Sequence, residues 1–245
     1  MEARSYSRGV DTLSYLTTAL AGYLLGSIPT GFLVAQAKGI DIRSVGSGNI
    51  GATNAFRVLG KPAGVFVLLM DALKGWLAVV VLPRLVLHLF AGPEDPSRSE
   101  QFQTIAGVCA ILGHNYTCWL SFKGGKGIAT SAGVLAALVP WALVIILSLW
   151  IILSALTRYV SVGSLVASFT LPFACWATGE SWTKIIVTGA MGAMAIYKHK
   201  ANIQRLLNGT ESRIGSKPKE AKQWLRWQCQ QRPTLFAHWQ AGIVP

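Results

Sequence analysis

Long apolar runs alternate with short polar stretches along most of the chain. The fourth run contains Pro140, which breaks the hydrogen-bond ladder of a helix, so we expect two segments that turn at Val139–Pro140. A helix needs about 20 mainly apolar residues to cross a bilayer, or about 17 at the short end. The pattern predicts an all-α, polytopic membrane bundle with about seven transmembrane segments, two of them marginal. The runs are Leu13–Ala35, Ala63–Phe90, Phe102–Leu120, Ile128–Leu156, Val160–Thr178 and Trp182–Tyr197.

Composition supports lipid as the solvent of these segments. Only 13% of the 245 residues are charged, whereas soluble domains carry about 25%, and the mean hydropathy is +0.45. The first run has no clear small-residue cleavage site, and the residues before it mix basic groups with Glu2 and Asp11. A signal peptide begins with a positively charged segment and ends at a small-residue cleavage site. This run shows neither clearly, so we expect the first helix to be retained.

The distribution of charge predicts an orientation. If the N-terminus lies outside, the loops rich in Lys and Arg fall on the cytoplasmic side, as the positive-inside rule requires. An odd number of crossings then places the C-terminus in the cytoplasm. The net charge of +12 fits this topology and an attraction to anionic membrane lipids, and we expect no nucleic-acid partner. The outer loops hold Glu94, Asp95, Arg98, Glu100 and Glu180, and the inner side receives Lys38, Arg43, Arg57, Lys61, Lys123, Lys126, Arg158 and the segment from Lys198 onward.

Three polar motifs interrupt the apolar pattern, and all fall on the predicted cytoplasmic side. The first motif, residues 46–57, places three glycines before a helix start, where unpaired N–H groups can meet an anion. Arg57 can hold a phosphate through two parallel hydrogen bonds. Tight helix packing would explain the glycines and serines, but not the two asparagines and the arginine beside them. The polar candidates in this motif are Ser47, Asn49, Thr53, Asn54 and Arg57.

The second motif, residues 122–127, resembles a truncated phosphate loop. A Walker A sequence needs Gly six positions before its Lys and Ser or Thr directly after it. Leu120 and Gly127 stand at those positions, so nucleotide hydrolysis is not expected. An anion cradle remains, with a positively charged interfacial loop as the alternative. Its candidates are Lys123, Gly124, Gly125, Lys126 and Gly127, with His114 a few residues earlier.

The third motif places His199, Asn202 and Arg205 three residues apart, on one helix face. This pattern predicts either part of a phosphate site or a basic helix that contacts lipid headgroups. Asp71 and Lys74 stand at the same spacing inside the second run. Ionisable residues at this depth are costly and usually pair, so we expect a structural pair that faces the bundle interior.

The remaining chemistry is sparse. The four cysteines show neither metal-ligand nor disulfide spacing, so we expect no metal site and no cofactor. We assign residues 1–213 to a membrane domain and residues 214–245 to a basic and aromatic C-terminal tail. The tail is either solvated or an interfacial helix, since Trp and Arg together favour headgroup regions.

Taken together, these motifs resemble the bacterial PlsY family of acyl-phosphate:glycerol-3-phosphate acyltransferases. The resemblance covers about residues 13–213, and the motifs occur in the family's order. It lies in Gly26-Ser27-Ile28-Pro29-Thr30-Gly31, Asp41-Ile42-Arg43, residues 46–57, Gly113-His114-Asn115, residues 122–127 and His199-Lys200-Ala201-Asn202-Ile203 up to Gly209-Thr210-Glu211.

The resemblance implies transfer of a fatty acyl group from acyl phosphate, rather than acyl-CoA, to the 1-hydroxyl of glycerol 3-phosphate, giving lysophosphatidic acid for phospholipid synthesis. It implies a bacterial inner-membrane enzyme whose active site faces the cytoplasm, linked functionally to the enzyme that makes acyl phosphate. Residues 124–127 would face the acyl phosphate. The implied substrate-binding residues are Ser47, Arg57, Lys126, His199 and Asn202, with Glu211, Ser161 and Ser164 as further candidates, and His199, Lys126 and Arg57 as the catalytic set.

The sequence leaves two questions open. The proton of the attacking hydroxyl could pass to His199, to His114 or to a substrate phosphate oxygen. A transporter of a phosphorylated metabolite would need the same cations and helices. Such a transporter tends to show paired halves with broken helices in matching positions, and no such pairing is apparent here.

Overall fold

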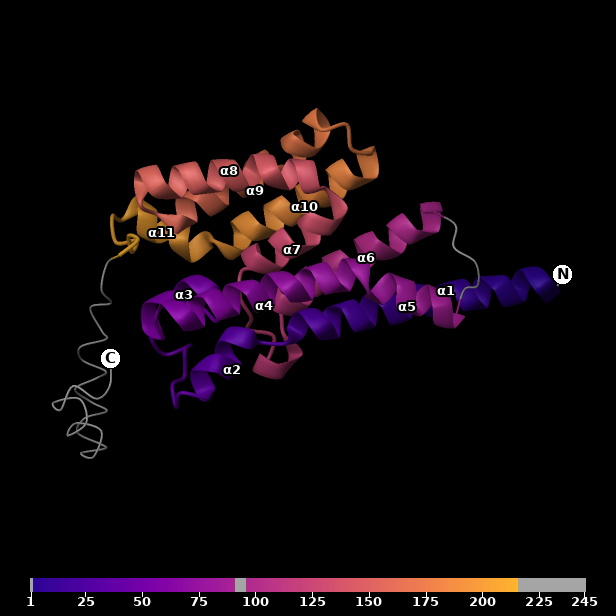
Figure 1. Cartoon of the computed structure of the whole chain (residues 1–245), viewed down its shortest axis with the longest axis horizontal. Helices are drawn as coiled ribbons and strands as arrows, with labels where there is room; N and C mark the ends of the chain where they lie inside the picture. Colours follow the sequence, from indigo (N-terminus) through magenta and orange to yellow (C-terminus); the bar gives the residue numbers. More distant parts are fainter. Residues whose placement is uncertain (1, 91–95, 216–245) are drawn as a thin grey trace.

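Figure 1 shows a computed structural model of the chain, which describes residues 2–90 and 96–215. Their backbone forms helices and loops, and no strand occurs in these two ranges. The C-terminal tail predicted from the sequence falls outside the description from residue 216 onward. In chain order the helices are α1 (Glu2–Ser27), α2 (Thr30–Gln36), α3 (Ala52–Val58), α4 (Lys61–Val80), α5 (Leu82–Phe90), α6 (Pro96–Asn115), the 3₁₀ turn η1 (Cys118–Leu120), α7 (Ile128–Leu138), α8 (Pro140–Thr157), α9 (Val160–Ala177), α10 (Trp182–Lys198) and α11 (Lys200–Leu207).

The predicted all-α membrane architecture is confirmed, while the number of spans stays a prediction. Four stretches of the described chain are long and apolar enough to cross a membrane: Thr12–Gln36, Lys61–Phe90, Pro140–Thr157 and Val160–Ala177. The shorter α7 has 11 residues, about 17 Å at the rise of an α-helix. It is therefore too short to cross a hydrocarbon core of about 30 Å.

Prolines and small residues set where the helices break. The expected turn at Pro140 is present, because α7 ends at Leu138 and α8 begins at Pro140. The first apolar run is interrupted at Ile28–Pro29, between α1 and α2. The third run leaves the α-helix after Asn115 and continues as the turn η1. Thr117 caps that turn by accepting a hydrogen bond from the N–H of Trp119.

The helices form two layers with α7 between them (Figure 1). In one layer α1 packs along α6 and α4 lies against α6, and in the other α8, α9 and α10 pack in sequence. The helix α7 joins the layers by packing on α4. Glycines permit these close approaches: a Cβ on Gly26 would lie 2.0 Å from the carbonyl oxygen of Ala110, and one on Gly133 would lie 1.8 Å from that of Ala72. Such contacts between small residues are typical of packed transmembrane helices.

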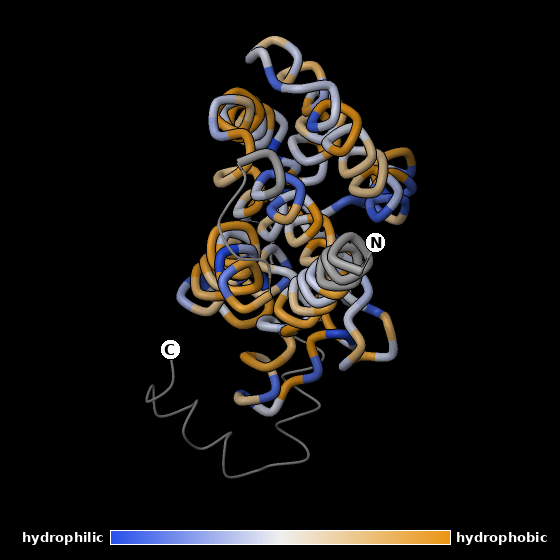
Figure 2. The backbone as a smooth tube through the Cα atoms, turned by 90° about the vertical axis from the view of Figure 1, so that its right-hand side faces the viewer, coloured by the Kyte–Doolittle hydropathy of each residue, from blue (hydrophilic) through white to orange (hydrophobic). Residues whose placement is uncertain are grey.

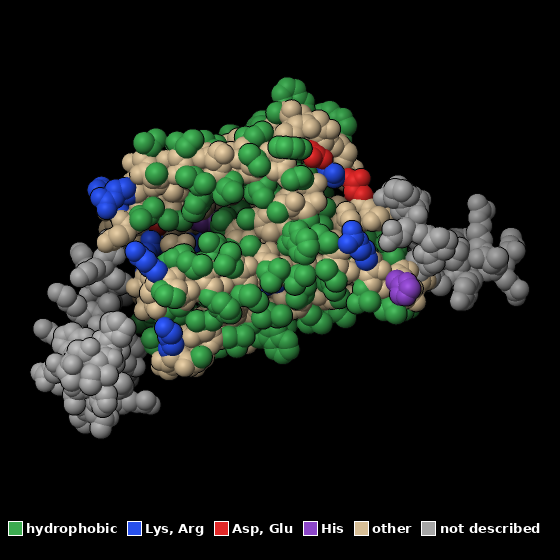
Figure 3. Space-filling view, in the orientation of Figure 1, with side chains coloured by type: hydrophobic (Ala, Val, Ile, Leu, Met, Phe, Trp, Pro, Cys, Tyr) green, Lys and Arg blue, Asp and Glu red, His purple; other side chains and the backbone are tan. Residues whose placement is uncertain are grey.

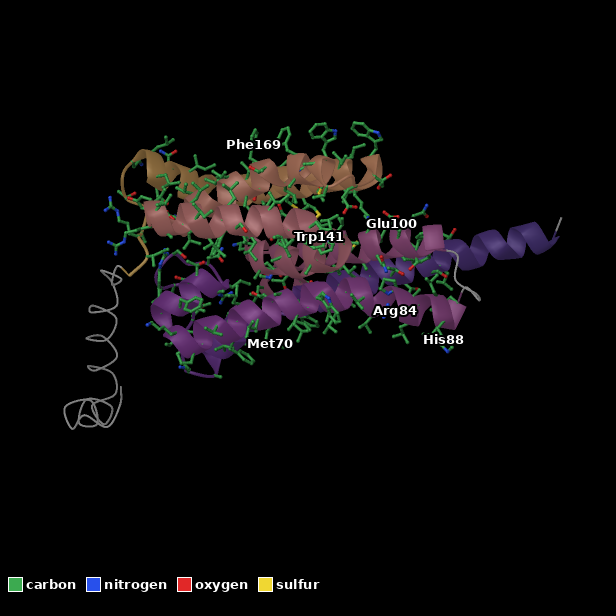
Figure 4. The ribbon with its side chains drawn as sticks, turned by 45° about the horizontal axis from the view of Figure 1, so that its top comes forward. Met70, Arg84, His88, Glu100, Trp141 and Phe169 are labelled. Atoms are coloured by element: carbon green, nitrogen blue, oxygen red, sulfur yellow. The ribbon has the colours of Figure 1, made fainter. Side chains whose placement is uncertain are left out.

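Apolar side chains cover the outside of the bundle and charged ones gather at its ends. In Figure 3 hydrophobic side chains cover the middle of the visible face, and basic ones cluster at the end where α3 and α11 lie. Figure 2, which looks along the bundle, shows hydrophobic residues in most helical turns. In Figure 4, Arg84, His88 and Glu100 lie at the opposite end. Leu156 is 77% exposed, Trp141 71% and Ile186 69%, as expected where lipid surrounds the helices.

Candidate active site

The three polar motifs meet at the basic end of the bundle. The first motif fills the loop between α2 and α3 and the start of α3, and the second leads into α7. The third begins where α10 passes into α11. Arg57 donates a hydrogen bond from Nη2 to the carbonyl oxygen of Ser212 at 3.2 Å, and Lys126 Nζ lies 2.5 Å from Oδ1 of Asn202. Segments far apart in the sequence thus form one site, as the charge pattern predicted.

Within the first motif, Asn54 shapes the loop and does not face a ligand. Its Nδ2 donates to the carbonyl oxygens of Ile42, Val45 and Asn49 at 3.2, 3.1 and 2.9 Å, and its Oδ1 accepts from the N–H of Ser47 at 2.9 Å. The side chain is 1% exposed. The expectation that Asn54 binds substrate is therefore corrected, because its amide is occupied by the loop.

The other polar residues of this loop divide in the same way. Asn49 uses Oδ1 to accept the N–H of Gly51 at 2.8 Å, which fixes the turn before α3. Ser47 and Thr53 are exposed, and Arg57 is partly exposed on α3. Arg57, Ser47 and Thr53 thus remain available at the surface of the site.

The glycines of the second motif serve close packing instead of cradling an anion. The N–H of Gly124 donates to the carbonyl oxygen of Asn115 at 3.2 Å, and the N–H of Gly125 donates to that of His114 at 3.0 Å. Gly127 adopts a φ of +79°, which favours glycine, and a Cβ there would lie 2.7 Å from Oδ1 of Asn115. The expected anion cradle is wrong for these two N–H groups, since both are used inside the protein.

The second motif contributes its cations unequally. Lys126 points into the site and reaches Asn202, whereas Lys123 lies exposed on the loop. Gly127 also precedes the first turn of α7, whose cap has no side-chain hydrogen bond. That turn adds the positive end of a helix dipole next to Lys126.

Glu211 organises the third motif. Its Oε1 accepts hydrogen bonds from Nδ2 of Asn202 at 2.7 Å and from the hydroxyl of Ser161 at 3.0 Å, and its Oε2 accepts from Nε of Arg205 at 2.7 Å. Three donors surround one carboxylate. Burial alone would raise the pKa of Glu211, but the hydrogen bonds and the charge of Arg205 outweigh it and lower that pKa. Glu211 thereby holds Asn202 and Arg205 in place, and its contact with substrate stays a prediction. The sequence places Arg205 in the third motif, but only the fold shows that its side chain bonds to Glu211.

Cations outnumber carboxylates at this site. Burial, with the positive charges of Arg205, Arg57 and Lys198, lowers the pKa of Lys126 to about 8 against the opposing effect of Glu211. Burial also lowers the pKa of Arg57, with Glu211 opposing and Arg205 adding to the shift. A dianion placed among these groups would relieve their mutual repulsion, so the site is electrostatically suited to a phosphate group.

His199 lies at the junction of α10 and α11, 3% exposed. Its Nδ1 is 2.7 Å from the carbonyl oxygen of Ala195. Since a carbonyl can only accept, Nδ1 carries the proton and Nε2 keeps a lone pair. Burial, and then the charge of Lys126, lower the pKa of His199 to about 4. The ring is therefore neutral at pH 7 and offers one hydrogen-bond acceptor.

An apolar cavity of about 190 Å³ lies among α4, α7, α8, α9 and α10. Ile128 and Ala195 belong to its lining; the first follows Gly127 and the second bonds His199. Ser164 also lines it, and its hydroxyl accepts from Nε1 of Trp150 at 3.1 Å and donates to the carbonyl oxygen of Val160 at 3.0 Å. Of the two predicted serines, Ser161 thus joins the polar cluster and Ser164 faces the cavity.

His114 lies apart from this cluster. It is 5% exposed, and its Nδ1 is 3.6 Å from Oδ1 of Asp71. A Cβ on Gly125 would lie 2.2 Å from its Nε2, so the glycine loop covers the ring. This placement counts against His114 as the base and against direct contact with substrate.

Fold and site define a polytopic helical membrane protein in which a cluster of cations lies near an apolar cavity. A family model described as glycerol-3-phosphate acyltransferase matches residues 16–209. A glycerol-3-phosphate acyltransferase from Synechococcus sp. (strain JA-3-3Ab) is 43% identical over 206 residues, which cover 84% of this chain and 96% of the relative. The enzyme of that name from Geobacter sulfurreducens is 42% identical, with 82% and 98% covered.

Solved structures agree with the sequence relatives. The crystal structure of PlsY (YgiH), an integral membrane glycerol 3-phosphate acyltransferase, in its glycerol 3-phosphate form matches with a TM-score of 0.72 and 37% identity, covering 82% of this chain and 96% of that one. Its lysophosphatidic acid form matches with a TM-score of 0.70 and 36% identity. The chain belongs to the glycerol-3-phosphate acyltransferase family, and it is an integral membrane acyltransferase.

Proposed function

We propose that this protein transfers a fatty acyl group from acyl phosphate to the 1-hydroxyl of glycerol 3-phosphate, releasing lysophosphatidic acid and inorganic phosphate. The observation that carries the proposal is the closeness of two unlike surfaces. Lys126, on which the charges of Arg57 and Arg205 act, stands two residues before Ile128, which lines the apolar cavity. A water-soluble phosphate ester needs the first surface, and an acyl chain needs the second.

In the proposed reaction, the hydroxyl oxygen attacks the carbonyl carbon of the acyl phosphate, and the bond from that carbon to the phosphate oxygen breaks. The hydroxyl proton leaves with a phosphate oxygen. Phosphate is already a good leaving group, so the protein mainly aligns the substrates and neutralises charge. Arg57, Lys126 and Arg205 supply that charge, and Glu211 holds Arg205 and the neutral amide of Asn202 in place.

The proton acceptor can be argued from the pKa of each group. The pKa of His199 is about 4, whereas the second pKa of a phosphate monoester is about 6. Burial and the charge of Lys126 therefore make His199 a weak base. We assign the proton to a substrate phosphate, and we assign to His199 Nε2 a hydrogen bond accepted from the other hydroxyl of glycerol 3-phosphate, which positions the acceptor substrate.

The proposal also covers the acyl donor and the membrane orientation of the enzyme. Acyl phosphate is the donor, an enzyme that makes acyl phosphate supplies it, and the site faces the cytoplasm of a bacterial inner membrane. The basic end of the bundle supports this orientation through the positive-inside rule, with the N-terminus outside and the C-terminus inside. Residues 214–245 form a separate tail in this proposal.

The decisive assay uses purified protein, labelled glycerol 3-phosphate, and palmitoyl phosphate against palmitoyl-CoA. We expect lysophosphatidic acid with palmitoyl phosphate, none with palmitoyl-CoA alone, and unchanged activity in chelator. Equal activity with palmitoyl-CoA would refute the donor. Movement of glycerol 3-phosphate across a vesicle membrane without product would favour the transporter alternative.

Orientation needs a separate experiment. In a variant without the native cysteines, we expect a cysteine at Ser44 to be shielded from an impermeant thiol reagent in intact cells and one at Ser97 to be labelled. The reverse labelling pattern would invert the proposed topology.

A further inference from the structure

A second group of ionisable residues lies away from the active site, inside the bundle. Asp71 and Lys74 on α4 and His114 on α6 are 1%, 5% and 5% exposed; we call them the inner cluster. Lys74 Nζ is 2.8 Å from Oδ1 of Asp71 and also donates to the carbonyl oxygen of Ile28 at 2.7 Å. The expected pairing of Asp71 with Lys74 is confirmed, and Lys74 additionally ties α4 to the break between α1 and α2.

Asp71 is placed to orient the imidazole of His114. The distance from its Oδ1 to Nδ1 of His114 is 3.6 Å. In the part of the chain that the structure describes, Nδ1 of His114 makes no hydrogen bond. The carboxylate of Asp71 therefore acts on the ring through its charge, from just beyond hydrogen-bonding distance.

The other edge of the ring lies against the glycine loop. His114 Nε2 occupies the space that a Cβ on Gly125 would need, at 2.2 Å. The carbonyl oxygens of His114 and Asn115 accept the N–H groups of Gly125 and Gly124. The backbone of His114 and Asn115 therefore holds the glycine loop through two hydrogen bonds. The next residue along the loop is Lys126.

We propose that Asp71 and His114 are positioning residues for acyl transfer: Asp71 orients the His114 ring, the ring supports Gly125, and the supported loop fixes the place of Lys126. Lys74 neutralises Asp71 and keeps it in register with α1. This inference rests on the proposed function, because it takes Lys126 to hold a phosphate group of the substrate. The inner cluster thereby gains a role in catalysis beyond the stability of a buried ion pair.

The test is a cycle of His114→Ala, Gly125→Ala and the double variant, with calorimetric Kd for glycerol 3-phosphate and with kcat and KM for palmitoyl phosphate transfer. Gly125→Ala forces a methyl group into the ring and moves the loop. Since displacements near 1 Å can cost up to 10²-fold, we expect about a tenfold to hundredfold weaker glycerol 3-phosphate binding. In the double variant the methyl group enters the space that the ring leaves. The double variant should therefore bind about as well as His114→Ala alone.

A matched control is Gly189→Ala in α10, where a Cβ would meet only Pro172 at an ordinary 3.8 Å; it should bind and react as the wild type does. Multiplicative losses in the cycle would overturn the proposal. So would a fall in kcat alone for His114→Ala, with unchanged Kd and a lost limb in the pH profile, because that pattern belongs to a general base.

Asp71 is tested without leaving a buried charge unpaired. Asp71→Leu combined with Lys74→Met removes both charges, and such replacements of a buried pair are often neutral for folding. We expect a folded protein by thermal unfolding, with the weaker glycerol 3-phosphate binding of His114→Ala. Wild-type binding in this folded variant would overturn the role of Asp71, and if the variant does not fold, the glycine cycle still decides the role of His114.

The binding arm separates this inference from the proposed donor. Wild-type protein that binds glycerol 3-phosphate but ignores palmitoyl phosphate would refute the donor and leave the cycle interpretable. Wild-type protein that does not bind glycerol 3-phosphate would overturn both proposals.

Discussion

The protein contains two ionisable clusters that differ in how their charges are balanced. At the active site, Arg57, Lys126 and Arg205 surround one carboxylate, Glu211. In the inner cluster, Asp71 and Lys74 pair one to one at 2.8 Å. Both clusters are built from side chains that approach at hydrogen-bonding distance, yet only the first keeps a surplus of positive charge.

This difference separates a site that binds from a cluster that supports. A buried pair must balance itself, because no ligand comes to compensate it and an isolated charge at that depth is costly. A site for a dianion must stay unbalanced until its ligand arrives. Burial first, and then the repulsion among its cations, lower the pKa of Lys126.

The comparison is tested most severely by Lys126→Ala. Charge-assisted hydrogen bonds contribute about 1.5–3 kcal/mol each, so we expect roughly a tenfold to hundredfold fall in kcat/KM. Lys61→Ala, which removes an exposed lysine at the start of α4, is the matched control and should react as the wild type does. Near-normal kinetics for Lys126→Ala would show that the surplus positive charge sets the membrane orientation and does not bind substrate.

Sequence reasoning anticipated the features that depend on local rules. Pro140 separates α7 from α8 as its missing N–H predicts, although Pro172 is accommodated inside α9. Asp71 and Lys74 share a helix face at a spacing of three. The convergence of the motifs followed from the alternation of spans and charges. The hydrogen-bond partner of each polar atom could not be predicted in this way, because it depends on which residues of other segments the fold brings next to it.

Asn54 and the second motif illustrate that limit. The composition of each motif fits an anion site. However, the side-chain Nδ2 of Asn54 donates hydrogen bonds to three carbonyl oxygens of its own loop. The N–H groups of Gly124 and Gly125 reach carbonyl oxygens at the end of α6. Likewise, Trp150 meets Ser164 only through the packing of α8 on α9.

Arg57→Lys should have the second largest effect. The change keeps the positive charge and removes the planar fork that can bind two phosphate oxygens. We expect roughly a tenfold loss of kcat/KM, carried mainly by a higher KM for glycerol 3-phosphate, because about one charge-assisted bond is lost. Arg43→Lys, on an exposed arginine that pairs with Asp41 at 2.8 Å, provides the control. Equal kinetics for Arg57→Lys and the wild type would reduce Arg57 to a topological charge.

The pH dependence of substrate binding should report the lowered pKa of Lys126. Below a pKa of about 8 the free enzyme carries the Lys126 charge, and it loses that charge as the pH rises through this value. Affinity for glycerol 3-phosphate should therefore fall above pH 8. The bound dianion raises the pKa of Lys126, so the limb in kcat should lie at higher pH than the limb in kcat/KM.

The matched variant is Lys126→Arg, which stays charged over this range. Its affinity should be flat between pH 7 and pH 9.5, whatever its absolute value. A limb near pH 8 that survives in Lys126→Arg would assign the titration to another group and would separate the surplus charge from Lys126.

The smallest effect is expected for His199→Gln. The proposed role of His199 is to accept one hydrogen bond at Nε2 from a hydroxyl of glycerol 3-phosphate that does not react, and the amide oxygen of Gln can also accept one. A neutral hydrogen bond contributes about 0.5–1.5 kcal/mol. KM for glycerol 3-phosphate should therefore rise only several-fold, with kcat largely retained at saturating substrate. If His199 were the general base, His199→Gln would instead cost about 10²–10⁴ in kcat and abolish a pH limb. Such a collapse in a folded variant would move the proton from the substrate phosphate to His199 and would make the protein, not the substrate, supply the base.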